Sequence, residues 1–303
     1  MPLVLLLYAL FASVFILAKF ALQVTEPLFL IGVRMTLAGV LIALFLYGFQ
    51  REKLRIKRKD LPHFILLGLT QIYLTNALEF WGLQYLTSFK TCFIYSLSPF
   101  ASAFICWLAF SEKMNFKKGF GLVIGFLGFI PIFLYQTQEE VLSGALFSFS
   151  LAELAVMGAA LSSVAGWILL KGLVFDKGYS PLLANGFAMG LGGVMALAHS
   201  FFVESWNPIP VTDLMSFILF GGALLIVSNL VCYNLYGYLL KRFSATFMSF
   251  AGFLTPLFTV LFGWIFLSEI PSTPFWISAI IVFSGLFLYY QEELVIKAPA
   301  QVS

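Results

Sequence analysis

Two charged side chains stand deep inside apolar runs, and they are the residues whose chemistry this sequence marks most plainly. Arg34 and Glu79 each lie well within a long apolar segment. A charge at the centre of a membrane helix costs roughly 2.5–3.5 kcal/mol on insertion scales, so such residues usually face a cavity or a partner. We expect either a buried ion pair or a contact with a polar substrate, and these two readings stay open.

The segment that holds Glu79 carries a polar face. Four of its residues recur at i, i+4, i+5 and i+8 and so share one side of a helix: Gln71, Thr75, Asn76 and Glu79. A later segment presents a corresponding face: Ser228, Asn229, Cys232 and Tyr233. Interhelical hydrogen bonds alone would account for the Asn and Ser residues. Glu79 has Cys232 as its counterpart, so the fold does not require a charge there, and this favours a role with a ligand.

Aromatic side chains accompany these polar faces. Tyr95 shares a face with two serines, and Trp167 follows another serine pair. Tyr and Trp rings could stack on a planar or amine-bearing substrate. We therefore predict seven substrate-binding residues: Arg34, Asn76, Glu79, Tyr95, Trp167, Asn229 and Tyr233. No catalytic, metal or cofactor site is predicted.

The elements that position these residues are membrane helices. Of the 303 residues, 61% are hydrophobic and 10% are charged, against about 25% charged in soluble domains. A span needs roughly 20 apolar residues, and spans that are not closed barrels must be helices. The predicted spans are 2–22, 27–48, 62–86, 89–110, 117–135, 147–170, 180–202, 213–239, 244–268 and 273–290. The first is taken as a span and not as a signal peptide.

The loops orient these spans. Six basic residues lie between 51 and 59, and acidic residues such as Glu139, Glu140 and Glu204 lie in alternate loops. This positive-inside pattern places both termini in the cytoplasm. The small net charge of +3 does not suggest a nucleic-acid partner.

The chain also repeats itself. Residues 93–128 match 250–285 at a constant shift, pairing Pro99 with Pro256 and two Ser-Glu pairs, 111–112 and 268–269. Each half has five spans, an odd number, so the halves insert with opposite orientation. We predict an all-α polytopic membrane protein of ten helices in two inverted five-helix repeats, 1–136 and 147–291, followed by a cytoplasmic tail, 292–303. Inverted repeats are typical of transporters that alternate access around a midplane site.

With Ser-Leu-Ser-Pro at 96–99 and Phe-Leu-Thr-Pro at 253–256, each ahead of Ser-Glu, the chain resembles the EamA-like branch of the drug/metabolite transporter superfamily. The resemblance covers nearly the whole chain. It implies ten helices around a central cavity and traffic in metabolites such as amino acids. Some relatives in intracellular bacteria resemble S-adenosylmethionine carriers, and the resemblance leaves the substrate open.

We therefore predict a secondary transporter, not an enzyme, for an amino acid-like or S-adenosylmethionine-like metabolite, in the bacterial inner membrane. There is no GxxxxGK loop for ATP. The alternatives are an intramembrane enzyme, for which no HExxH or paired nucleophile and base appears, and a channel. The predicted partners are the substrate and the lipid bilayer. Coupling to a proton or a counter-metabolite, and monomer or dimer, stay open.

Four smaller predictions can be checked in a structure. Lys90 should snorkel to the outer membrane interface. The repeated Glu112 and Glu269 should cap or pair with a neighbouring helix. Pro99 should bend its span. The GxxxG spacings at 121–125 and 186–190 should allow close helix packing.

Overall fold

A computed structural model gives the fold, which is built almost entirely of helices. It describes residues 2–110, 116–239, 248 and 251–296. Among these residues, seven helices are long and apolar enough to cross a membrane, which supports an integral membrane protein. They are Pro2–Leu22, Pro27–Phe49, Phe116–Phe133, Leu151–Asp176, Pro181–Val203, Leu214–Cys232 and Thr273–Gln291.

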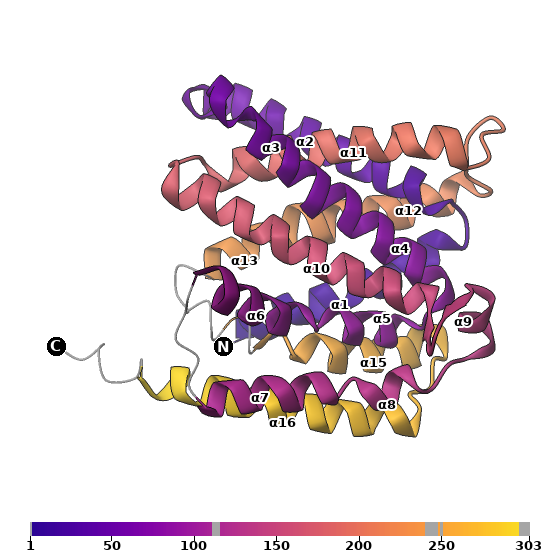
Figure 1. Cartoon of the computed structure of the whole chain (residues 1–303). Helices are drawn as coiled ribbons and strands as arrows, with labels where there is room; N and C mark the ends of the chain where they lie inside the picture. Colours follow the sequence, from indigo (N-terminus) through magenta and orange to yellow (C-terminus); the bar gives the residue numbers. More distant parts are fainter. Residues whose placement is uncertain (1, 111–115, 240–247, 249–250, 297–303) are drawn as a thin grey trace. The chain divides into compact units, whose positions relative to one another are not determined.

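Helices follow one another along the described chain (Figure 1). The first half contains α1 (Pro2–Leu22), α2 (Pro27–Phe49), η1 (Arg51–Leu54), η2 (Arg58–Asp60), α3 (Leu61–Leu67), η3 (Gly68–Leu74), α4 (Thr75–Tyr85), α5 (Ser88–Tyr95), α6 (Ser98–Phe110), α7 (Phe116–Leu127) and α8 (Ile130–Phe133). A connection with α9 (Gln138–Leu142) and a two-stranded antiparallel hairpin, β1 (Ala145–Leu146) and β2 (Phe149–Ser150), follows. The second half contains α10 (Leu151–Lys171), η4 (Gly172–Asp176), α11 (Pro181–Val203), α12 (Leu214–Leu224), η5 (Leu225–Cys232), α13 (Tyr233–Leu239), α15 (Leu254–Leu267) and α16 (Thr273–Ile296).

The chain forms two compact units, and each unit takes segments from both predicted repeats. Unit 1 contains Met1–Ile16, Tyr85–Met157 and Cys232–Ser303. Unit 2 contains Leu17–Gln84 and Gly158–Val231. The compact units are therefore not the sequence repeats, because packing joins helices of one half to helices of the other.

In unit 2, α2 packs along α11 through small residues (Figure 1). A Cβ added to Gly39 would lie 2.5 Å from Cα of Gly190. A Cβ added to Gly193 would lie 2.4 Å from the backbone nitrogen of Thr36. Only glycine permits such an approach at these two positions, and the close packing predicted around 186–190 is confirmed.

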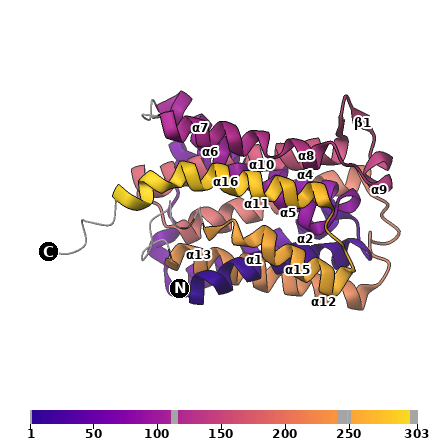
Figure 2. The ribbon, with the colours of Figure 1, turned by 90° about the horizontal axis from the view of Figure 1, so that it is seen from below.

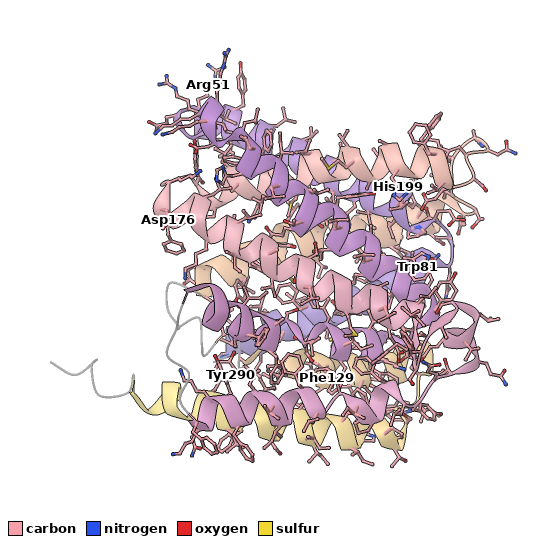
Figure 3. All side chains as sticks on the ribbon, viewed as in Figure 1. Arg51, Trp81, Phe129, Asp176, His199 and Tyr290 are labelled. Atoms are coloured by element: carbon pink, nitrogen blue, oxygen red, sulfur yellow. The ribbon has the colours of Figure 1, made fainter. Side chains whose placement is uncertain are left out.

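In unit 1, α7 runs beside α16 in both views of the ribbon (Figures 1 and 2). Gly121 and Gly125 face Gly285, whose added Cβ would lie 2.4 Å from the backbone nitrogen of Gly125. Aromatic rings fill the interior next to this pair: Phe93 lies 5.0 Å from Phe129 between ring centroids. Phe129 lies on the inner side of the α7–α8 segment (Figure 3) and is 1% exposed.

The predicted span 89–110 is interrupted near its proline. Helix α5 ends at Tyr95 and α6 begins at Ser98, with a turn between them. Proline has no N–H to donate to the preceding turn and its ring crowds that turn. The bend predicted at Pro99 is therefore confirmed.

Two carboxylates cap helices of the other half of the chain. Glu269 accepts hydrogen bonds from the Ser88 backbone N–H at 2.9 Å and from its hydroxyl at 2.5 Å, at the start of α5. Glu204 accepts from the N–H groups of Leu28 and Phe29, at 2.6 and 2.9 Å, at the start of α2. An anion at a helix N-terminus satisfies free N–H groups and opposes the helix dipole. The capping role predicted for Glu269 is confirmed, and Glu112 lies outside the described residues.

The prediction that Lys90 snorkels is wrong. Its side chain is 4% exposed, and its Nζ lies 2.5 Å from Glu140 Oε2 and 2.7 Å from Glu153 Oε1. It also donates to the Tyr135 carbonyl at 2.9 Å. When an ammonium group is buried, paired carboxylates and hydrogen bonds must replace the water that it loses. The partners lie 45 to 63 residues further along the chain, on the connection after α8 and at the start of α10, so local sequence could not reveal them.

Candidate functional site

Three of the predicted residues meet in unit 2. Arg34 on α2 donates from Nη2 to Asn76 Oδ1 at 2.8 Å. Its guanidinium lies over the Phe80 ring, 4.9 Å from the centroid, and it interacts electrostatically with Glu79. Arg34 and Asn76 are 3% and 7% exposed, whereas Glu79 is half-buried. This arrangement places a carboxylate within electrostatic reach of a guanidinium, and the two groups complement an amino acid's own ammonium and carboxylate.

The helix that carries Asn76 and Glu79 departs from α geometry just before them. Residues Gly68–Leu74 form the π-helix η3, and Thr75 Oγ1 donates to the Thr70 carbonyl at 2.8 Å. Of the two other π-helical stretches among the described residues, η4 and η5, the latter carries Asn229. Such stretches are rare and often mark functional sites. Periodicity assumes 3.6 residues per turn, so the sequence could not show these insertions.

Asn229 lies in an unusual environment beside α2. Its Nδ2 lies 3.0 Å from the Met35 sulfur and 3.7 Å from the Met189 sulfur. The side chain is 1% exposed, and its Oδ1 has no hydrogen-bond partner within the described residues. The two methionines were not predicted as part of this site, because apolar thioethers in apolar helices give no signal. A buried acceptor without a partner costs free energy. The Oδ1 of Asn229 is such an acceptor, and a ligand could donate a hydrogen bond to it.

Gln71 is a further polar residue of unit 2 that the predicted set omits. It is 3% exposed, and neither its Oε1 nor its Nε2 has a partner within the described residues. Helix α10 lies directly against it, since a Cβ added to Gly166 would lie 2.4 Å from Gln71 Cβ. The shared polar face of η3 and α4 was the sequence signal that could have added Gln71 to the set.

The three predicted aromatic residues are divided between the two units. Trp167 belongs to unit 2 and is 42% exposed. Tyr95 at the end of α5 and Tyr233 at the start of α13 belong to unit 1, and both are half-buried. Their role as substrate contacts stays a prediction.

Another exposed polar contact of unit 2 lies near the end of α11. His199 (Figure 3) is hydrogen-bonded through Nδ1 to the Tyr73 hydroxyl at 2.8 Å. Across the part of the chain that the structure describes, no group of three His, Cys, Asp or Glu residues could hold a metal ion. Cys92 and Cys232 are buried and form no disulfide.

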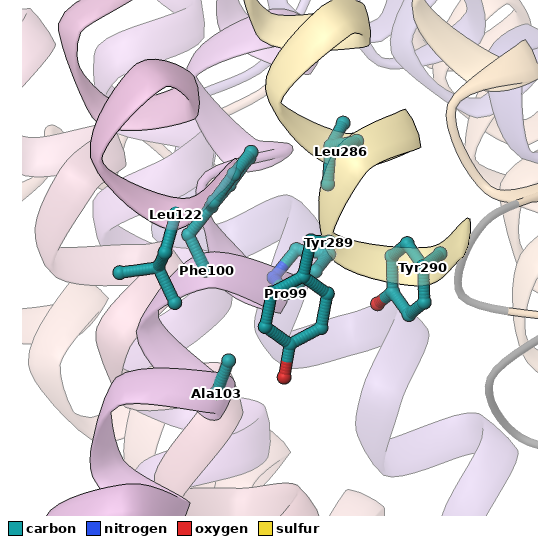
Figure 4. A pocket seen from close by; sticks show the side chains of 7 residues that line it. All are labelled: Pro99, Phe100, Ala103, Leu122, Leu286, Tyr289 and Tyr290. Carbon is teal, nitrogen blue, oxygen red and sulfur yellow. The ribbon is translucent and has the colours of Figure 1, made fainter. Parts of the chain in front are cut away.

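A small pocket in unit 1 does not match the charged cluster (Figure 4). Its empty space is about 150 Å³. It is lined by Pro99, Phe100, Ala103, Leu122, Leu286, Tyr289 and Tyr290. No lining residue is charged, so this pocket offers nothing to hold a charged metabolite, and the Arg34–Asn76–Glu79 cluster remains the candidate binding site.

Comparisons with known proteins identify relatives of the whole chain. The S-adenosylmethionine/S-adenosylhomocysteine transporter of Chlamydia muridarum is 39% identical over 93% of this chain and 88% of its own length. The protein of that name in Chlamydia trachomatis serovar L2 is 40% identical over 93% and 86%. A Bacillus subtilis protein described as an uncharacterized transporter, YoaV, is 28% identical over 89% of both chains.

A solved structure with 16% sequence identity shares the fold, with a TM-score of 0.65 over 98% of this chain and 96% of its own. The sequence profile of the EamA-like transporter family matches residues 1–134 and 150–291. This chain therefore belongs to the EamA-like transporter family, within the drug/metabolite transporter superfamily, and it is a transporter and not an enzyme.

Proposed function

We propose that this chain carries S-adenosylmethionine and S-adenosylhomocysteine across a bacterial inner membrane. The observation that carries the proposal is the identity of 39–40%, over 93% of the chain, with two proteins bearing that name. At this level of identity the fold and the general position of the binding site are usually shared, so a shared substrate is the simplest expectation.

The chemistry of unit 2 supports this substrate. S-adenosylmethionine has a carboxylate, an ammonium group, a sulfonium cation and an adenine ring. The Arg34 guanidinium suits the carboxylate in a two-pronged contact, and Glu79 suits the ammonium or the sulfonium. Arg34 and Glu79 interact electrostatically with each other, and the substrate would exchange this internal interaction for two external ones.

The aromatic residues would serve the adenine. We propose that one of them, Trp167 of unit 2, stacks on the ring, since every base offers a π-face to Trp. Asn229 would accept a hydrogen bond at its open Oδ1. Replacement of each by Ala should lower uptake more than membrane expression.

We also propose the finer architecture: ten helices in two inverted repeats, 1–136 and 147–291, with both termini and the tail 292–303 in the cytoplasm. Helices at equivalent positions of the two repeats pack as pairs, α2 with α11, α7 with α16 and α5 with α15. Two inverted repeats around a shared axis would produce such pairs. Residues Leu61–Tyr85 form one continuous helix. This helix is not among the seven apolar membrane-length helices, because Gln71, Asn76 and Glu79 lower its hydropathy.

The test is counterflow in proteoliposomes. Vesicles loaded with unlabelled S-adenosylhomocysteine should accumulate labelled S-adenosylmethionine faster than empty vesicles, and uptake should saturate. Equal rates would indicate a channel, because a channel shows no counterflow. A pH gradient in place of internal substrate tests proton coupling. No uptake under either condition, with amino acids transported instead, would overturn the proposed substrate.

A further inference from the structure

The connection between α8 and α10 must lie at a membrane surface. It joins the membrane-length helices Phe116–Phe133 and Leu151–Asp176. Its residues 134–150 contain α9 and the β1–β2 hairpin, so they are far too compact to cross a bilayer again. Tyr135, at its start, is 47% exposed, and tyrosine is enriched where helices leave the hydrocarbon.

Its inner side is fixed to unit 1. Glu140 on α9 reaches Lys90. Glu153 accepts from the Ser150 backbone N–H at 2.8 Å and from Gln136 Nε2 at 3.3 Å. Phe149 packs edge-on against Phe133, with ring centroids 5.2 Å apart. The connection is thus held in one conformation by charges and one ring, and its outward side chains have a defined direction.

Its outer side carries large apolar side chains next to the exposed Gln138, Glu139 and Ser148. Four side chains are largely exposed: Val141 at 58%, Leu142 at 80%, Leu146 at 52% and Phe147 at 95%. Phe147, at the hairpin tip, has φ +56°, a left-handed conformation that a bulky residue rarely adopts. An observed strain of this kind points to a function that repays it. A tip meant for water would normally carry Gly or Asn there.

The exposed side chains continue a lipid-facing stripe. On α7 and α8, exposed apolar residues recur every three or four positions: Phe120, Val123, Leu127, Ile130 and Leu134. The stripe ends at Leu134, where the connection begins. The connection contains no basic residue, and its acidic residues are Glu139, which is exposed, and Glu140, which is buried. Attraction to anionic headgroups therefore cannot hold it, whereas apolar insertion can.

We propose that the connection 134–150 is an interfacial anchor that inserts Leu142 and Phe147 into the boundary between lipid headgroups and acyl chains. It lies on the membrane surface and does not span it. Its occupant is the lipid of the bilayer that holds the protein. The projection of the hairpin beyond α8 in Figure 2 leaves its tip free for this contact.

The test places an environment-sensitive fluorophore on single added cysteines of the full chain in phosphatidylcholine vesicles. Phe147→Cys and Leu142→Cys are the test positions, and Glu139→Cys, an exposed neighbour on the same connection, is the matched control. Labelled wild type gives the background of the native cysteines. At the two test positions we expect a blue-shifted emission and several-fold stronger quenching by doxyl-lipid than by aqueous iodide, with the reverse at Glu139→Cys.

Two results would overturn the proposal. Iodide quenching at Phe147→Cys as strong as at Glu139→Cys would place the tip in water. Crosslinking between Phe147→Cys copies that persists at high dilution in lipid would assign the tip to a second copy of the chain. Leu142→Cys reports the same insertion from α9. It therefore still tests the proposal if Phe147→Cys disturbs the hairpin.

Discussion

Arg34 and Lys90 are both cations that the chain buries, but their surroundings differ. The Nζ of Lys90 is surrounded by the carboxylates of Glu140 and Glu153 and by the Tyr135 carbonyl. Arg34 has one amide at 2.8 Å, one aromatic ring and the half-buried Glu79. Both carboxylates of the first cluster are buried, whereas Glu79 in the second is half-buried. The difference suggests that Lys90 serves the fold and Arg34 serves transport.

The largest effect should come from Lys90→Met. The change leaves Glu140 and Glu153 buried without their cation, and breaking a buried pair costs about 3–5 kcal/mol. We expect a marked fall in Tm in detergent and in the yield of folded protein. Adding Glu140→Gln and Glu153→Gln should recover part of the loss. Lys177→Met, which breaks a pair with a side chain 30% exposed, is the control and should cost far less.

The second effect separates the two clusters by function. Glu79→Gln keeps the size of the side chain and removes the charge that we assign to a substrate cation. A hydrogen bond to a charged group contributes about 1.5–3 kcal/mol, so apparent KM should rise by roughly tenfold or more. Tm should fall less than in Lys90→Met, because Glu79 is half-buried whereas Glu140 and Glu153 are buried. The exposed Glu139→Gln is the control. A Glu79→Gln protein with wild-type uptake per molecule and a lowered Tm would make Glu79 a structural partner of Arg34.

A third comparison uses the two asparagines at matching positions of the repeats. Asn76→Leu removes the acceptor of Arg34 and should destabilise by about 1–3 kcal/mol. Asn229→Leu removes a buried Oδ1 that has no partner in the described chain, so its cost should be smaller. Thermal unfolding of both variants measures this. Uptake by Asn229→Leu should nevertheless fall; a stable variant with intact transport would remove Asn229 from the site.

The smallest effect concerns acid stability at Asp60. Hydrogen bonds from Lys177 Nζ and the Tyr179 hydroxyl, each at 2.7 Å, hold the pKa of Asp60 below its ordinary value. A lowered carboxyl pKa stabilises the fold above the unfolded-state pKa of about 3.9, and the gain is lost as pH falls through the lower folded value. The Tm difference between wild type and Asp60→Asn should be constant from neutral pH down to about pH 5 and shrink below that. A difference independent of pH would exclude the linkage.

The sequence was informative where one helix carries the whole signal. Apolar length predicts the seven membrane-length helices among its ten spans, and glycine spacing predicts the close packing at Gly121 and Gly125. A shared helical face predicts that Asn76 and Glu79 lie on one side of their segment, where Asn76 meets Arg34. It was uninformative where partners come from distant segments. Glu140 is 50 residues from Lys90, and the thioethers beside Asn229 look like any other apolar side chains. The π-helical stretches break the very period on which face assignments rest.

The two glutamate caps impose an order on biosynthesis. Glu204, which caps Leu28, follows it by 176 residues in the chain, and Glu269, which caps Ser88, follows it by 181. At about 5–20 residues per second, translation needs on the order of 10–40 s to supply each cap. Until then the free N–H groups at the starts of α2 and α5 must rely on water, headgroups or the insertion machinery. The first half of the chain is thus synthesised early, but its helices α2 and α5 are capped late. A ribosome that stalls before residue 269 leaves α5 without its cap.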